Sequence, residues 1–318
     1  MVVGLGHPAV SKETTSMTLD ILMPFYGRFD HFRAAVDSVR AQTSDDWHLT
    51  VVDDVYPDLE PGQWLVALDD PRISYVRNTE NLRPSRNYNK SVGIATSEFV
   101  VLMGCDDVML PGYIARVKEL IAQFPGAAVV QPGVSVIDES GVPSRPLADR
   151  VKRWYRLPGS GARAASGEAL AVSLLRGNWT YFPSLVWRRE LLLDGFRTDL
   201  DVVQDLAMLF DIACAGGTLV VDDEVVFEYR RHSTSVSAVT GFDGSKFIQE
   251  NTLFAEAAAT SIKLGWNRAA RVAKRHLSSR LNAASELPGA IWSRNAVGRS
   301  TLTRHIFGLP YKTFRPAP

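Results

Sequence analysis

The chain has few cysteines and no long apolar run. Its 318 residues include two cysteines, Cys105 and Cys214. Two cysteines are too few for the disulfide framework of a small secreted protein, and they fit a reducing cytoplasm. No apolar run reaches the length of about 18 residues that predicts a membrane-spanning helix. Residues 1–17 lack the charged and then apolar pattern of a secretion signal, so we expect a flexible leader and a cytoplasmic protein.

Two apolar runs end in paired acids. Residues 99–107 run from apolar side chains into Asp106 and Asp107, and residues 47–54 also end in two acids. Such runs are typical of strands buried on both faces of a parallel sheet, whose carboxyl ends bind ligands in open α/β folds. Paired carboxylates there suit magnesium or manganese bridging to phosphates. The alternative is a turn whose acids favour the start of a helix.

Strand and helix patterns alternate along the first half of the chain. The predicted strands are residues 19–26, 47–54, 73–76 and 99–107, and helical spacing follows at 29–39, after 82 and at 114–124. This alternation predicts an α/β fold with a mainly parallel, Rossmann-like sheet flanked by helices.

Four motifs in order resemble the inverting family-2 glycosyltransferases of the GT-A fold, across about residues 18–235. The motifs are Pro24-Phe-Tyr26, Val52-Asp53-Asp54, Asn89 followed by Ala95 and Glu98, and Cys105-Asp106-Asp107. Gly27 and Gly104 stand where many members carry Asn and the first acid of an Asp-x-Asp motif. The resemblance implies a GT-A catalytic domain over residues 18–240, with a nucleotide-sugar half at 18–137 and an acceptor-side half at 138–240.

The resemblance also implies which residues bind the donor. They are Pro24, Tyr26, Asp53, Asp54, Arg83, Arg86, Asn89 and Asp106. Pro24 and Tyr26 would line the base pocket, Asp54 would accept a hydrogen bond from the base, and Asp106 would hold the ribose. Either arginine would meet the diphosphate or base, or would be a solvated cation.

The remaining implied roles concern the metal, the base and the acceptor. Asp107 would hold a divalent ion, manganese or magnesium, and His232 would ligate it or donate to the diphosphate. Asp205, at the start of a helical stripe, would be the catalytic base, with stabilisation of the helix N-terminus as the alternative. Trp179 and Tyr181 would contact an acceptor sugar or be core aromatics.

The C-terminal region, residues 241–318, is strongly basic. From residue 263 onward the cations are Lys263, Arg268, Arg271, Lys274, Arg275, Arg280, Arg294, Arg299, Arg304, Lys312 and Arg315, against Glu286 alone. Residues 267–284 show helical spacing. We favour a basic helical appendage that docks on the acidic catalytic domain or on a second subunit, with peripheral membrane contact as the alternative. No nucleic-acid motif is recognised, so we expect no such partner.

The predicted function is transfer of a sugar from a nucleoside-diphosphate sugar to an acceptor hydroxyl, metal-assisted and with inversion. A UDP-sugar is the favoured donor, with dTDP- and GDP-sugars as alternatives. The expected acceptor is a glycan or a lipid-linked molecule, and the expected role is in polysaccharide or glycoconjugate synthesis. One rival is a nucleotidyltransferase, which usually has a glycine-rich basic loop after the first strand, where this chain has Pro24-Phe-Tyr-Gly-Arg28. The other is a non-catalytic sugar-nucleotide or glycan-binding protein.

Overall fold

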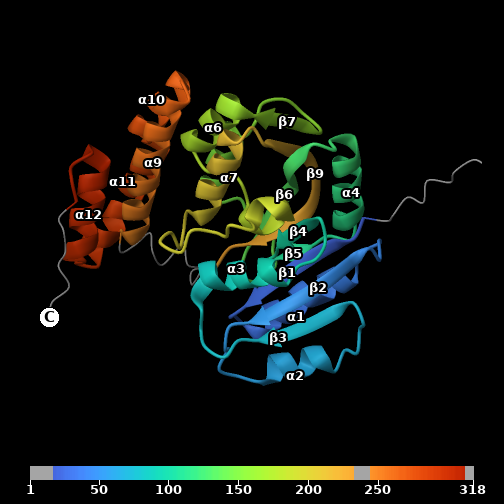
Figure 1. Ribbon diagram of the computed structural model, residues 1–318. Helices are drawn as coiled ribbons and strands as arrows, with labels where there is room; N and C mark the ends of the chain where they lie inside the picture. Colours follow the sequence, from blue (N-terminus) through green and yellow to red (C-terminus); the bar gives the residue numbers. More distant parts are fainter. Residues whose placement is uncertain (1–16, 233–243, 312–318) are drawn as a thin grey trace, which may run out of the picture.

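The protein is built on a nine-stranded sheet with helices on both faces, as Figure 1 shows. The structure, a computed structural model, describes residues 17–232 and 244–311. The expected leader, apart from Met17, lies outside the described residues. The predicted α/β class is confirmed.

The first four strands of the sheet are parallel. They are β1 (Leu19–Phe25), β2 (Trp47–Asp53), β3 (Ile73–Arg77) and β4 (Phe99–Leu102), in the spatial order β3-β2-β1-β4. These strands match the predicted ones to within a few residues, although β4 ends before the acids that follow it.

Beyond β4 the sheet is mixed. Its strands are β8 (Val186–Arg188), β6 (Ala127–Ile137), β9 (Thr218–Arg230), β5 (Val108–Met109) and β7 (Arg163–Ser166). β8 runs antiparallel between β4 and β6, β6 and β9 are parallel, and β5 and β7 each pair antiparallel with β9.

Two hydrophobic layers hold the helices to the sheet. The helices are α1 (Phe29–Arg40), α2 (Glu60–Val66), α3 (Arg83–Ile94), α4 (Tyr113–Gln123), α5 (Leu147–Tyr155), α6 (Gly167–Arg176) and α7 (Gln204–Cys214). Because side chains alternate along a strand, Ile21 and Met23 pack with α1 and α4, whereas Leu22 packs with α6 and α7 on the other face.

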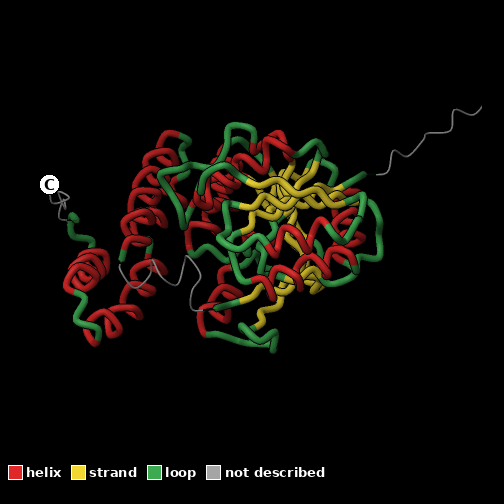
Figure 2. Tube along the Cα trace, turned by 90° about the horizontal axis from the view of Figure 1, so that it is seen from below, coloured by secondary structure: helices red, strands yellow, loops and turns green. Residues whose placement is uncertain are grey.

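Four further helices extend the molecule away from the sheet, at the left of Figures 1 and 2. They are α9 (Ser245–Lys263), α10 (Asn267–Arg275), α11 (Leu277–Trp292) and α12 (Ala296–Phe307). The single helical pattern predicted at 267–284 is divided at His276, whose φ is +27°. No helix among the described residues has the length and apolar character to cross a membrane.

The basic residues of α10 do not dock on the catalytic domain. This helix packs against α6 and α9 through Ala269, Ala270 and Ala273, which are buried, while its four cations are exposed. Small side chains allow close helix packing, and charged side chains would lose hydration in that interface. The expectation that the basic face covers the catalytic domain is therefore wrong for this helix.

Candidate active site

The predicted donor-binding residues lie where the parallel strands end. Residue pairing aligns Pro24 of β1 with Val52 of β2, and Leu22 with Leu102 of β4. The strands run in the same direction, so their carboxyl ends, and the acid pairs that follow, meet at one edge of the sheet. This is the edge at which open α/β sheets bind ligands.

Asp107 is a buried carboxylate with one oxygen left unpaired. Its side chain is 1% exposed, and its Oδ1 accepts a hydrogen bond from the backbone N–H of Arg230 at 2.8 Å. Its Oδ2 is buried and has no hydrogen-bond partner. Burial, and then the neighbouring Asp106, raise the pKa of Asp107. An unpaired buried carboxylate oxygen is costly, so this position is suited to a cation.

Asp106 and His232 form a pair beside Asp107. His232 Nε2 lies 2.7 Å from Asp106 Oδ2, and this hydrogen bond is the main cause that raises the pKa of His232. Arg230 fixes the same loop, since its Nε donates to the Asp106 carbonyl at 2.7 Å. His232 thus contacts, through Nε2, an acid predicted to bind the donor.

Because Gly104 has no side chain, the carboxylates of Asp106 and Asp107 can lie close to its backbone. A Cβ at this position would overlap Asp107 Oδ2 and would lie 2.9 Å from Asp106 Oδ1. The glycine that replaces the first acid of the motif is therefore required by the positions of the next two acids. From the sequence alone, Gly104 is only the loss of a possible metal ligand.

These two oxygens fit the ligand set of a divalent cation. Magnesium is commonly bound by one or two carboxylates, with substrate phosphates and water as its other ligands. Asp107 Oδ2 is unpaired, and Asp106 Oδ1 converges on the same side of Gly104. Among the described residues, no group of three or more His, Cys, Asp or Glu is arranged to hold a metal. A cation here would therefore depend on the diphosphate.

Asp54 has a structural role that the resemblance did not imply. Its Oδ1 accepts from Asn78 Nδ2 and from the Leu82 N–H, each at 2.7 Å, and its Oδ2 accepts from the Arg83 N–H at 2.9 Å. The buried carboxylate thus holds the loop that leads into α3. Three protein donors already bind its two oxygens, so a nucleobase could add a hydrogen bond only at Oδ2, which accepts one.

Asp53 is likewise committed to the protein. Its carboxylate accepts from the Tyr56 N–H at 2.7 Å, from the Tyr75 hydroxyl and from the Arg77 guanidinium. It is buried, so it supports the edge of the sheet and does not face a ligand.

Tyr26 is an exposed aromatic residue at the edge of the sheet where the parallel strands end. Its side chain is 56% exposed, directly after β1, and its ring meets Tyr56 edge-on at 5.7 Å between centroids. Arg83 and Arg86 are exposed at the start of α3, and neither forms an ion pair with a described residue. All three side chains are accessible to a bound nucleotide.

Asn89 is used inside the protein. Its Nδ2 donates to the Phe196 carbonyl at 2.9 Å, and its Oδ1 accepts from the Phe196 N–H at 2.6 Å. Gly195 has a φ of +80°, and a Cβ there would crowd the Asn89 amide. Asn89 therefore anchors the segment that leads to α7, a role that the resemblance did not imply.

Asp205 lies in the first turn of α7 and is buried. Its Oδ2 accepts from Asn178 Nδ2 at 3.0 Å, and its Oδ1 accepts from the Leu206 N–H at 2.7 Å. Burial raises the pKa of Asp205, and the Asn178 hydrogen bond opposes that rise. Asn178 is itself oriented by Thr180, whose hydroxyl donates to Asn178 Oδ1 at 2.6 Å. The sequence did not reveal this support.

Tyr88 is influenced by charged groups from both parts of the site. Burial raises the pKa of its hydroxyl, and the nearby Cys105, Asp106 and Asp205 raise it further. Asp106 follows β4 and Asp205 begins α7, so acids from the donor edge and from the predicted base both lie within electrostatic reach of Tyr88. Tyr88 belongs to α3 and was not predicted.

A second charged cluster borders Asp205. Asp149 accepts from Arg231 Nε at 2.6 Å and from its terminal nitrogen at 2.7 Å, and also from the Tyr181 hydroxyl at 2.9 Å. Burial alone would raise the pKa of Asp149, but the Arg231 hydrogen bonds hold it below its usual value. Lys152 Nζ lies 4.3 Å from the Tyr181 ring centroid. Burial, then Arg231, lowers the pKa of Lys152 to about 8.

The two aromatic residues predicted on the acceptor side have different environments. Tyr181 is half-buried within the Asp149 cluster. Trp179 is 1% exposed, and its Nε1 donates to Ser173 Oγ at 3.0 Å. Trp179 is a core residue whose ring is covered, so the acceptor role predicted for it does not fit this structure.

The comparisons with known proteins agree with this geometry. Residues 20–174 match the sequence model of Glycosyl transferase family 2. The Succinoglycan biosynthesis protein ExoO of Rhizobium meliloti (strain 1021) is 25% identical over 241 residues, which are 75% of this chain and 67% of ExoO. ExoW, a succinoglycan biosynthesis protein of the same strain, is 31% identical over 111 residues, which are 33% of this chain and 34% of ExoW.

A solved structure shows the same fold. S. aureus TarS 1-349, in complex with UDP-GlcNAc, superposes with a TM-score of 0.61 at 13% identity, over 93% of each chain. Residues 20–174 therefore belong to glycosyl transferase family 2, and the chain has the GT-A fold. The family predicted from the four motifs is confirmed, and the nucleotidyltransferase alternative is not favoured.

Proposed function

We propose that this glycosyltransferase moves a sugar from a UDP-sugar to an acceptor hydroxyl with inversion at the anomeric carbon, in the synthesis of a polysaccharide or glycoconjugate. The UDP moiety is supported by the UDP-GlcNAc complex of TarS, and the biosynthetic context by ExoO and ExoW. The acceptor would be a glycan or a lipid-linked sugar. The two free cysteines support a cytoplasmic site of action.

The observation that carries this proposal is the placement of Asp205. It is a buried carboxylate at a helix start and accepts a hydrogen bond from Asn178. Asp205 and Asp106 both lie within electrostatic reach of Tyr88. Burial raises its pKa, which makes the carboxylate a stronger base, while Asn178 and the nearby Lys152 favour its ionised form. Each Asp205 oxygen accepts one hydrogen bond from the protein, so each keeps a lone pair that could take the proton of an acceptor hydroxyl.

The chemistry requires one proton transfer to the protein. The acceptor oxygen forms a bond to the anomeric carbon as its proton passes to the Asp205 carboxylate. The bond between that carbon and the diphosphate oxygen breaks, and its electron pair leaves with the nucleoside diphosphate. Attack opposite to the leaving group inverts the configuration and needs no covalent sugar–enzyme intermediate. Asp205 then returns the proton to water.

Asp107 and Asp106 would hold a divalent cation together with the diphosphate. A manganese or magnesium ion bound there supplies positive charge that offsets the charge of the leaving group. Tyr26 would cover the nucleobase, and Arg83 or Arg86 would meet the diphosphate. We propose that the catalytic domain comprises residues 18–240, because β8 and β9 complete the sheet and α7 carries the proposed base.

The experiment is release of UDP from a panel of UDP-sugars, with and without manganese and with candidate acceptors. The variant is Asp205→Asn, and the matched control is Asp211→Asn, an exposed acid of the same helix. General-base catalysis contributes about 10²–10⁴-fold, so Asp205→Asn should lose that much turnover and keep its affinity for UDP, while Asp211→Asn stays active. Full activity in Asp205→Asn would refute the assignment. Binding without turnover in the wild type would favour the binding-protein alternative.

A further inference from the structure

The last two described helices form a hairpin at the end of the molecule farthest from the sheet (Figures 1 and 2). We define the C-terminal hairpin as α11, α12 and the turn between them. Its inner side packs on α9 through Phe247, Ala283, Ala290 and Leu302, which form a small core of their own. The hairpin is therefore a folded element with a defined outer surface.

The outer face of α11 is apolar. Leu277 and Leu281 are 64% and 58% exposed, and Ile291 continues this face at helical spacing. The buried face of the same helix carries the smaller or polar residues Ser279 and Ala283. A surface helix normally buries its large apolar side chains and exposes polar ones. This reversed pattern indicates a surface that is covered by something else.

Trp292 extends the apolar face at the end of α11. It is 92% exposed, the most exposed of the large hydrophobic side chains among the described residues. Val297 and Phe307 of α12 and Leu309 beyond it are also exposed. Tryptophan is enriched where protein meets the boundary between lipid and water, because its ring is apolar and its N–H is polar.

Arginines accompany this apolar surface. Residues 277–311 contain Arg280, Arg294, Arg299 and Arg304 and a single acid, Glu286. The preceding helix α10 adds four exposed cations and no acid. Positive charge beside exposed apolar side chains is the composition of interfacial segments that bind anionic lipid.

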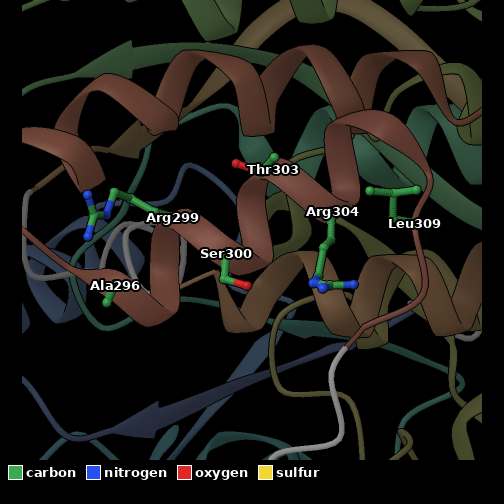
Figure 3. A pocket seen from close by; sticks show the side chains of 6 residues that line it. All are labelled: Ala296, Arg299, Ser300, Thr303, Arg304 and Leu309. Carbon is green, nitrogen blue, oxygen red and sulfur yellow. The ribbon is translucent and has the colours of Figure 1, made fainter.

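α12 also carries a pocket of about 410 Å³ with the chemistry of a phosphate site. Figure 3 shows Arg299 and Arg304 near its two ends, with the hydroxyls of Ser300 and Thr303 between them. Arg304 donates to the Pro310 carbonyl at 2.6 Å, whereas Arg299 is exposed and forms no ion pair with a described residue. Guanidinium and hydroxyl groups together suit a phosphate head group.

We propose that the C-terminal hairpin docks on an anionic phospholipid surface, with its apolar side chains in the interface and its arginines on lipid phosphates. A second copy of the chain is less suited to this surface. In a twofold dimer the same patch meets itself, which would bring the arginines of the two copies together without acids to pair them. The proposal does not depend on the transferred sugar or on the catalytic base.

The test is co-sedimentation of the full chain with vesicles of phosphatidylcholine alone or mixed with phosphatidylglycerol. We expect binding to the anionic vesicles only, weakened by salt because exposed charges are screened. Arg299→Gln should lower the partition coefficient by about fivefold, the loss expected for one basic residue near an anionic surface. Trp292→Ser should lower it as well, by removing the apolar anchor. Arg176→Gln, an exposed arginine at the end of α6, is the matched control and should bind as wild type.

Three results would overturn the proposal. The first is no binding to anionic vesicles. The second is binding that neither Arg299→Gln nor Trp292→Ser reduces. The third is a concentration-dependent dimer, seen by light scattering, that Trp292→Ser dissociates, since a second copy would then cover the hairpin. Both substituted side chains are exposed, so thermal unfolding should be the same in each variant and wild type.

Discussion

Restoring the acidic motif of the family at Gly104 should destabilise the fold of this protein. In Gly104→Asp, and equally in Gly104→Ala, the new Cβ would overlap Asp107 Oδ2. Asp107 cannot turn away freely, because it is buried and its Oδ1 binds the Arg230 backbone N–H. Asp106, the other neighbour, is tied to His232. The loop must therefore shift or lose a hydrogen bond.

The size of the effect follows from these contacts. Overpacking costs about 1–3 kcal/mol, and loss of a hydrogen bond to a charged group costs about 1.5–3 kcal/mol. Unfolding entropy is about 2.1 cal/mol/K per residue, so for 318 residues each kcal/mol lowers Tm by about 1.5 °C. Either cost alone predicts that Gly104→Ala melts about 2–5 °C below wild type.

The assay is thermal unfolding by circular dichroism, with UDP release measured in parallel. The matched control is Gly93→Ala on α3, where a Cβ meets nothing within 4 Å. Alanine is the better helix former, so this control should melt at or slightly above the wild-type temperature. If Gly104→Ala melts with the control and keeps full activity, the acids do not pack over Gly104 as described.

Two further predictions concern pH. Asn178→Ala removes a donor that favours ionised Asp205, so the pKa of Asp205 should rise and the acid limb of the rate–pH profile should move to higher pH; a lower rate with an unshifted profile would contradict this. Arg231→Met leaves the buried Asp149 carboxylate without its cation, a loss of about 3 kcal/mol by analogy with broken buried pairs. Arg231 lowers the pKa of Asp149 in the folded protein. The Arg231–Asp149 pair therefore stabilises the fold fully above the pKa of Asp149 in the unfolded chain, and this stabilisation is lost as the pH falls through the pKa of Asp149 in the folded protein. The difference in Tm should therefore be largest near neutral pH and shrink in acid, and a difference independent of pH would exclude the pairing as its cause.

Local patterns were sufficient to predict the four parallel strands and the edge at which they end, and four motifs indicated the family; the strands beyond β4 were not predicted. The apolar run of β4 and the helical spacing of α1 are properties of a few consecutive residues, and their burial follows from hydrophobicity and periodicity. The acid pairs stand directly after strands, so parallel pairing alone brings them to one edge. These inferences needed no knowledge of distant contacts.

The uses of the individual side chains depended on the tertiary structure. Asp54 and Asn89 match family motifs, yet their polar atoms bind backbone groups from segments far along the chain, Leu82 and Phe196. Asp205 obtains its partner Asn178 in the same way. Whether a carboxylate faces a ligand or holds a loop depends on which donors the folded chain brings within hydrogen-bond distance. The sequence determined which chemical groups gather at the edge of the sheet, and only the tertiary structure decided which of them remain free, because buried polar groups must first be paired within the protein.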